Sequence, residues 1–189
     1  MDNVSADTKH SRIRASLILL LLIVVIPGGT YLYIEKKWII DPLPLGNTIP
    51  SVVLSTVNGV NVRTDSLISM KTVFVFFSIS CPHCKRELMY LDSLHSIFKN
   101  DIEIIAVSLS SRPETIQFAD ELKLPFPVYL DTGNEAKLRF RVMPVPALFY
   151  FTRHKRLIKY QAGEQRRESL HTTFQQFSSV PDDSLLLAL

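Results

Sequence analysis

Uninterrupted apolar runs alternate with stretches of helical periodicity along most of the chain. Residues 72–77 carry no charge, which is typical of a strand buried on both faces inside a sheet. After them, Leu88, Leu91 and Leu94 recur at helical spacing and are expected to face a core. Further strands are predicted at residues 52–57, 60–62, 102–109, 126–130, 147–151 and 157–160, and further helices at residues 111–122, 135–140 and 166–177. This alternation predicts an α/β domain with a mixed central sheet.

Two local signals mark the boundaries of these elements. Asn58 and Gly59 separate the first two strands and are a strong signal for a tight hairpin turn. Ser111 and Glu114 have the spacing of a capping box, in which each side chain bonds the backbone of the other residue at a helix start. We assign no function to the apolar end of the chain, residues 185–189.

Residues 15–34 form an uncharged, apolar segment that is long enough for one membrane-spanning helix. About 20 residues at 1.5 Å each cover the roughly 30 Å hydrocarbon core of a bilayer. Lys9, Arg12 and Arg14 precede the segment, so the positive-inside bias places the N-terminal tail in the cytoplasm. The sequence therefore predicts a single-pass anchor in the inner (cytoplasmic) membrane, with the rest of the chain in the periplasm or an equivalent extracytoplasmic space.

A cleaved signal peptide is the alternative for this segment. Pro27, Gly28 and Gly29 interrupt the apolar run, which leaves a strongest part of only about a dozen residues. Residues 30–33 are too bulky for a small-x-small cleavage site, which favours an uncleaved anchor. Either interpretation exports the rest of the chain.

The net charge of the 189 residues is +3, which is too small to indicate a nucleic-acid-binding protein. No stripe of basic residues interleaved with aromatic residues is present in the sequence, and no glycine-rich phosphate loop. A nucleic-acid partner is therefore not expected.

The strongest chemical signal is the motif Cys81-Pro82-His83-Cys84, which holds both cysteines of the chain. This spacing would arise in about one of a hundred random placements, and the helix predicted at residues 85–98 follows it. Residues i and i+3 in a first helical turn lie close enough for a disulfide. The N–H groups and the dipole at this end of a helix favour the thiolate of Cys81, which makes it the nucleophile. Pro82 suits the first helical turn, and His83 can add positive charge beside the thiolate.

Two structural interpretations of the motif compete with redox chemistry. A closed zinc site needs four ligands, whereas the remaining histidines are scattered over positions 10, 95, 154 and 171. A permanent disulfide would close a very short loop and would add little loop entropy. Both are weaker predictions than a dithiol that opens and closes.

The order of these elements and motifs resembles the thioredoxin superfamily, in particular its membrane-anchored TlpA-like branch of redoxin or alkyl hydroperoxide reductase (AhpC-TSA) type. The resemblance rests on the lead-in at residues 45–50, the Cys-x-x-Cys motif at a helix start, Glu87 three residues beyond it, the extra segment 118–131 and the sequence Val142-Met143-Pro144-Val145-Pro146-Ala147 before a strand. It implies a thioredoxin-like fold with helices on both faces of the sheet. The organisation expected is a tail at residues 1–14, an anchor at 15–34, a linker at 35–44, the thioredoxin-like domain at 45–178 and a second tail at 179–189.

The resemblance assigns the redox roles within the motif. Cys81 matches the nucleophilic cysteine of the family, and Cys84 matches the resolving cysteine. Pro82 and His83 stand at the two positions that tune the redox potential.

The resemblance also assigns roles outside the motif. Pro146 matches a cis-proline that lies against the dithiol, and Val145 before it would offer its backbone to an extended substrate. A loop that is merely stiffened by its prolines is the alternative. Glu87 matches a glutamate that helps to move the proton of the resolving cysteine, and a solvated glutamate in the first helical turn is the alternative.

The activity implied is thiol–disulfide exchange, in which Cys81 attacks a partner disulfide and Cys84 resolves the mixed disulfide. No cofactor or metal is expected besides the redox-active disulfide. Electrons would pass between a membrane thiol-transfer protein and exported thiol or disulfide proteins, such as an apocytochrome in cytochrome c maturation. A reductant is favoured, but Pro82-His83 is more typical of oxidising members, so a thiol oxidant stays open.

Two further functions stay open for the motif. A thiol peroxidase fits the redoxin resemblance, although Ser78 is a poor substitute for the hydroxyl residue that peroxiredoxins carry before their reactive cysteine. A Cu(I)-binding module would use the two thiolates together with a histidine.

Overall fold

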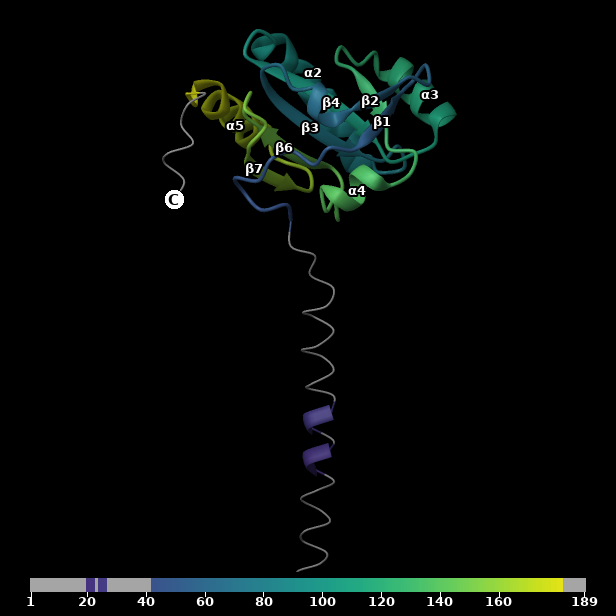
Figure 1. Ribbon diagram of the computed structural model, residues 1–189, viewed down its shortest axis with the longest axis vertical. Helices are drawn as coiled ribbons and strands as arrows, with labels where there is room; N and C mark the ends of the chain where they lie inside the picture. Colours follow the sequence, from purple (N-terminus) through teal and green to yellow (C-terminus); the bar gives the residue numbers. More distant parts are fainter. Residues whose placement is uncertain (1–19, 23, 27–41, 182–189) are drawn as a thin grey trace, which may run out of the picture. The chain divides into compact units, whose positions relative to one another are not determined.

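A mixed seven-stranded sheet forms the centre of the domain in the computed structural model, which describes residues 20–22, 24–26 and 42–181 (Figure 1). The strands are β1 (Val53–Thr56), β2 (Asn61–Arg63), β3 (Lys71–Phe77), β4 (Ile102–Ser108), β5 (Val128–Leu130), β6 (Ala147–Phe151) and β7 (Leu157–Ala162). They lie in the order β2-β1-β5-β4-β3-β6-β7. β4 is parallel to both β3 and β5, while the remaining neighbouring pairs are antiparallel. The predicted mixed sheet is therefore confirmed.

The helices of the domain connect or follow these strands. They are the short 3₁₀ helix η1 (Thr64–Ser66), α2 (Pro82–Phe98), α3 (Arg112–Leu122), α4 (Glu135–Arg139) and α5 (Arg167–Ser179). The carboxylate of Asp131 accepts hydrogen bonds from the N–H groups of Ala136 at 3.1 Å and Lys137 at 2.7 Å. These bonds satisfy backbone donors at the start of α4 that the helix itself leaves without a partner.

The two faces of the sheet bury separate hydrophobic clusters. Successive residues of a strand point to opposite faces, so Val73 and Val75 pack with α2 and α5, whereas Phe74 and Phe76 pack with Phe140 at the end of α4. Helices therefore lie on both faces, as the resemblance implied. The ring centroid of Phe140 lies 5.0 to 6.1 Å from four other centroids, those of Phe74, Phe76, Phe149 and Phe151.

The two local signals of the sequence have different outcomes. The hairpin is confirmed, because β1 pairs with β2 through a turn in which Gly59 has a φ of +86°. This conformation favours glycine, since any Cβ is crowded at positive φ. The capping box is wrong, because the Ser111 hydroxyl donates to the Glu114 carboxylate and neither side chain caps the helix backbone. Two polar side chains placed to cap the backbone bond each other instead.

Of the predicted anchor at residues 15–34, the structure describes only residues 20–22 and 24–26, which are helical. Within the described part of the chain, no helix is long and apolar enough to cross a membrane. The tail predicted at residues 1–14 and most of the one at 179–189 lie outside the described residues.

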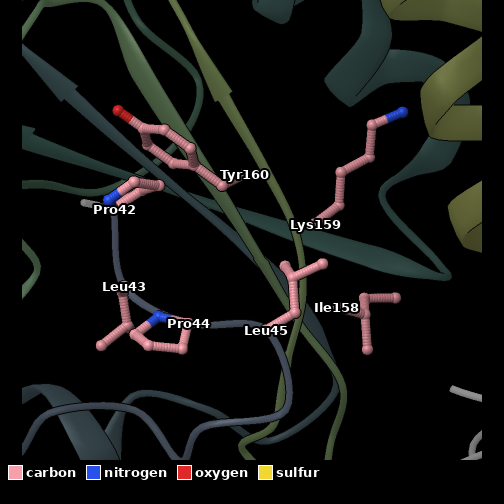
Figure 2. A pocket seen from close by; sticks show the side chains of 7 residues that line it. All are labelled: Pro42, Leu43, Pro44, Leu45, Ile158, Lys159 and Tyr160. Carbon is pink, nitrogen blue, oxygen red and sulfur yellow. The ribbon is translucent and has the colours of Figure 1, made fainter. Parts of the chain in front are cut away.

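Strand β7 forms one edge of the sheet, and the beginning of the domain lies along it. The N–H of Gly46 donates to the carbonyl of Leu157 at 2.7 Å, and the N–H of Leu157 donates to the carbonyl of Asn47 at 2.9 Å. Next to these bonds lies a largely apolar pocket of about 470 Å³ (Figure 2). No residue of the cysteine motif lines it, so we assign it no part in thiol chemistry. Its lining residues are Pro42, Leu43, Pro44, Leu45, Ile158, Lys159 and Tyr160.

Candidate functional site

The motif lies at the junction between β3 and α2, where Cys81 is the residue that caps the helix. Its backbone is extended, with φ −94° and ψ 110°, and its half-buried sulfur accepts a hydrogen bond from the N–H of Cys84 at 3.4 Å. Pro82 begins the helix, where a missing N–H breaks no hydrogen bond. A sulfur at this position accepts a hydrogen bond from a backbone N–H and lies at the positive end of the helix dipole.

The loop before β6 lies against this sulfur. The peptide bond between Val145 and Pro146 is cis, as predicted, and the thiol of Cys81 donates to the carbonyl oxygen of Val145 at 3.6 Å. The neighbouring strands β3 and β6 bring the two segments together, since Phe76 pairs with Ala147 immediately after the proline. The structure thus joins Cys81, Val145 and Pro146 in one site, although they are far apart in the sequence.

Cys84 is fully buried in the first turns of α2, and both cysteines are free thiols in the structure. Burial raises the pKa of Cys84 to about 12, and a backbone hydrogen bond from Ser78 opposes this shift only in part. The hydrogen bond with Cys81 and the charges of Cys81 and Glu87 make smaller contributions to the same raised pKa. A thiol with this pKa is protonated at neutral pH, so it needs a base before it can attack a disulfide.

Glu87 is a buried carboxyl group and not the solvated glutamate of the alternative, because only 2% of the residue is exposed. One oxygen, Oε2, accepts a hydrogen bond from the N–H of Gln165 at 3.1 Å, while the buried Oε1 has no hydrogen-bond partner among the described residues. Burial raises the pKa of Glu87 to about 7, the Gln165 bond partly opposes this rise, and the charge of Glu164 adds to it. Glu87 therefore exchanges protons near neutral pH and retains an oxygen that can accept one.

His83 bonds to a group that no sequence motif singles out. Its Nδ1 atom lies 2.6 Å from Oε2 of Glu164, which follows β7, and 2.9 Å from Nη2 of Arg86. Arg86 donates two hydrogen bonds to the same carboxylate, from Nε to Oε1 at 2.7 Å and from Nη2 to Oε2 at 2.6 Å. The hydrogen bonds from Arg86 and His83 lower the pKa of Glu164 to about 2, so it is ionised at neutral pH.

Three consecutive residues between β7 and α5 hold three parts of the site. The N–H of Gly163 donates to the carbonyl of Pro146 at 2.8 Å, the carboxylate of Glu164 binds His83, and the N–H of Gln165 binds Glu87. We call residues 163–165 the site loop. No spacing in the sequence connects this loop with α2, so sequence reasoning missed it.

Hydroxyl groups gather beside the segment that leads from β3 to Cys81. The Oγ of Ser78 lies 3.0 Å from that of Ser80 and 3.4 Å from that of Ser110, and the N–H of Ile79 donates to Ser110 Oγ at 3.2 Å. These bonds fix the conformation of the segment and so the position of the sulfur that follows it.

Comparison with known proteins supports the likeness that the motif and the fold suggest. A family model for the AhpC/TSA family matches residues 45–160. The thiol-disulfide oxidoreductase ResA of Geobacillus thermodenitrificans is 26% identical over 167 residues, which cover 86% of this chain and 94% of ResA.

Two solved structures share the fold. The thioredoxin domain of a thiol-disulfide oxidoreductase from Bacteroides vulgatus aligns with a TM-score of 0.63 and 19% identity, over 72% of this chain and 99% of that one. The peroxidoxin BcpB of Mycobacterium tuberculosis aligns with a TM-score of 0.63 and 16% identity, over 72% of this chain and 96% of BcpB. At these identities the two structures establish a thioredoxin-like fold and leave the chemistry open.

Proposed function

The chain belongs to the AhpC/TSA family, and from this premise we propose that it is a thiol–disulfide oxidoreductase that exchanges electrons with protein disulfides. One observation carries the proposal: the half-buried sulfur of Cys81 lies 3.6 Å from the carbonyl of Val145, and the second thiol, Cys84, is buried one helical turn away. A partly exposed cysteine whose sulfur lies beside a backbone carbonyl suits a protein substrate, while the buried sulfur of Cys84 suits the resolving step.

The reaction proceeds in two exchanges. The Cys81 thiolate attacks one sulfur of the substrate disulfide, which forms a mixed disulfide and releases the other substrate sulfur as a thiolate. Cys84 then loses its proton and attacks the sulfur of Cys81, which closes the Cys81–Cys84 disulfide and releases the second substrate thiolate. Two electrons pass to the substrate, and a partner dithiol must reduce the enzyme again.

Glu87 takes the proton from Cys84 in the second exchange. With a pKa of about 7, Glu87 is ionised above neutral pH and can accept a proton. Because the pKa of Cys84 is about 12, the transfer takes place together with the attack of its sulfur on Cys81, which consumes the thiolate as it forms. The oxygen without a hydrogen-bond partner among the described residues is the natural acceptor. The closed disulfide removes the need for this base, so Glu87 can release its proton before the next cycle.

The chain works as a reductant anchored in the inner membrane, with its domain outside the cytoplasm. The sequence of residues 15–34 and the basic residues before it support the anchor and its orientation. The reducing direction is supported by the family resemblance alone. The electron donor of the chain is a membrane thiol-transfer protein, and its substrates are exported proteins with a disulfide, with apocytochromes as the class that the family resemblance implies.

Reduction of insulin by the full chain in a non-ionic detergent, with dithiothreitol as electron source, tests the activity. The wild-type protein is expected to accelerate precipitation of the insulin B chain, and Cys81→Ser is expected to abolish the acceleration. Cys84→Ser is expected to accumulate a mixed disulfide that mass spectrometry detects, because Cys81 can attack but nothing resolves it. If Cys81→Ser is as active as the wild type, the proposal is wrong.

Peroxide reduction is the second candidate, because the family and the BcpB likeness both allow it. The Ser78 hydroxyl, which would have to serve a peroxide, is bonded instead to the hydroxyls of Ser80 and Ser110, at 3.0 Å and 3.4 Å. Rapid consumption of hydrogen peroxide that is lost in Cys81→Ser, without insulin reduction, would replace the first proposal with this one.

A further inference from the structure

The carboxylate of Glu164 bonds two side chains of the first turns of α2, the imidazole of His83 and the guanidinium of Arg86. His83 Nδ1 and the Nε and Nη2 atoms of Arg86 each lie within 2.7 Å of an oxygen of this carboxylate. His83 Nδ1 and Arg86 Nη2 lie 2.9 Å apart. The charge of Cys81 acts on the same group of side chains: the pKa of Arg86 is raised first by its bond to Glu164 and, more weakly, by attraction to Cys81. The thiol-exchange mechanism above leaves Glu164 without a role.

The position of Glu164 is fixed from both sides. In the site loop, Gly163 is bonded to Pro146 and Gln165 to Glu87, so the residue between them has little freedom to move. The two hydrogen bonds from Arg86 restrict the Glu164 carboxylate further. Glu164 is thus held at the Nδ1 atom of His83 by the loop on both sides of it, although the side chains of His83 and Arg86 are more than half exposed.

This arrangement determines how much positive charge Cys81 experiences. A cation near the sulfur stabilises the thiolate of the reduced form, which makes a dithiol a stronger oxidant. Glu164 offsets the positive charge of Arg86, and it bonds the Nδ1 atom of the His83 imidazole. The reduced form is therefore less favoured than it would be beside Arg86 and His83 without this carboxylate.

We propose that Glu164 is a positioning residue that holds His83 and balances its charge, and that it thereby makes the Cys81–Cys84 couple more reducing than the Cys-Pro-His-Cys motif is by itself. The proposal rests on the thiol–disulfide activity proposed above. It also accounts for a reductant that carries a dipeptide more typical of oxidising proteins.

Redox titration of the full chain in detergent against glutathione buffers tests the proposal. Glu164→Gln keeps the shape and the acceptor oxygen but removes the charge. It is expected to shift the equilibrium with glutathione about tenfold toward the dithiol, which corresponds to about 30 mV in the oxidising direction. No shift, or a shift in the reducing direction, would overturn the proposal.

The matched control is Glu121→Gln. Glu121 also pairs with a cation of α2, Lys85, at 2.9 Å. Lys85 is about as exposed as His83 and Arg86, but neither Lys85 nor Glu121 belongs to the site. Its removal changes the net charge by the same amount and is expected to move the equilibrium less than twofold. An equal shift in both variants would mean that only net charge matters, and the proposal would be wrong.

A second comparison tests the route through His83. In a His83→Ala background, Glu164→Gln is expected to shift the equilibrium no more than threefold, because Arg86 is then the one remaining partner whose charge Glu164 balances. A full tenfold shift in that background would exclude the role of His83. If the wild-type chain forms no Cys81–Cys84 disulfide in any buffer, the proposed activity itself fails, whereas a normal couple that Glu164→Gln leaves unchanged refutes this inference alone.

Discussion

Replacement of Glu87 with glutamine is expected to change how the stability of the domain depends on pH. The folded protein holds the proton of Glu87 up to a pKa of about 7, whereas an unfolded chain releases it near the ordinary value of 4.5. Between these values the native state binds more protons, so the contribution of Glu87 to stability is fully present below pH 4.5 and is lost as the pH rises through about 7. A difference of about 2.5 pKa units corresponds to about 3 kcal/mol.

Glutamine cannot ionise, so Glu87→Gln lacks this loss. The amide oxygen can still accept the bond from the N–H of Gln165, and any cost of burying the amide nitrogen is the same at every pH. The stability of the variant relative to the wild type should therefore rise by about 3 kcal/mol between pH 4.5 and pH 8.

Urea unfolding of the reduced full chain in detergent at pH 4.5, 6 and 8 measures this difference, with Glu121→Gln as the exposed control. A difference between Glu87→Gln and the wild type that stays constant within about 1 kcal/mol over this range would show that Glu87 does not hold a raised pKa in the folded protein. A rise of the same size in Glu121→Gln would also contradict the prediction, because the effect would then not come from burial of Glu87.

Two further substitutions test the fold that positions the site. Phe140→Ala should lower the free energy of unfolding by about 3 to 5 kcal/mol, because it leaves a cavity among four other aromatic rings. A loss below about 1 kcal/mol, measured by urea unfolding, would contradict this prediction. Asp131→Ala should lower the free energy of unfolding by about 1 to 2 kcal/mol, because it removes the acceptor of the two N–H bonds at the start of α4. Asp131→Asn should lose less, because its amide oxygen can still accept one of these bonds. Equal losses in both variants would show that these bonds do not stabilise the helix.

The elements of this fold are largely predictable because their hydrophobic patterns are strong. The uncharged run of β3 and the leucine spacing of α2 each identify an element with little ambiguity, and both lie where the pattern predicts them. The prediction fails where polar groups have a choice of partner. Ser111 and Glu114 have the correct spacing for a capping box, yet their side chains bond each other, and spacing alone cannot distinguish the two outcomes.

The site is predictable only as far as its residues stand near one another in the sequence or match a family motif. The cysteine motif and Pro146 are found in this way, and the cis bond before Pro146 is present. Glu164 and Gln165 are missed because their contacts join segments 78 and more residues apart, and the contact of Gln165 uses its backbone N–H, which no residue type reveals. The burial of Glu87 also depends on the packing of α2, and the sequence pattern leaves a buried and a solvated carboxylate equally open.

Redox titration of the wild-type chain decides whether Cys81 and Cys84 form one redox couple. Thiol labelling and mass spectrometry across dithiothreitol and glutathione buffers should show a single two-electron transition between a dithiol and an internal disulfide, with a midpoint below about −200 mV, as befits a reductant. Two cysteines that never join in a disulfide, or a midpoint near the roughly −120 mV of a strong oxidant, would contradict the account.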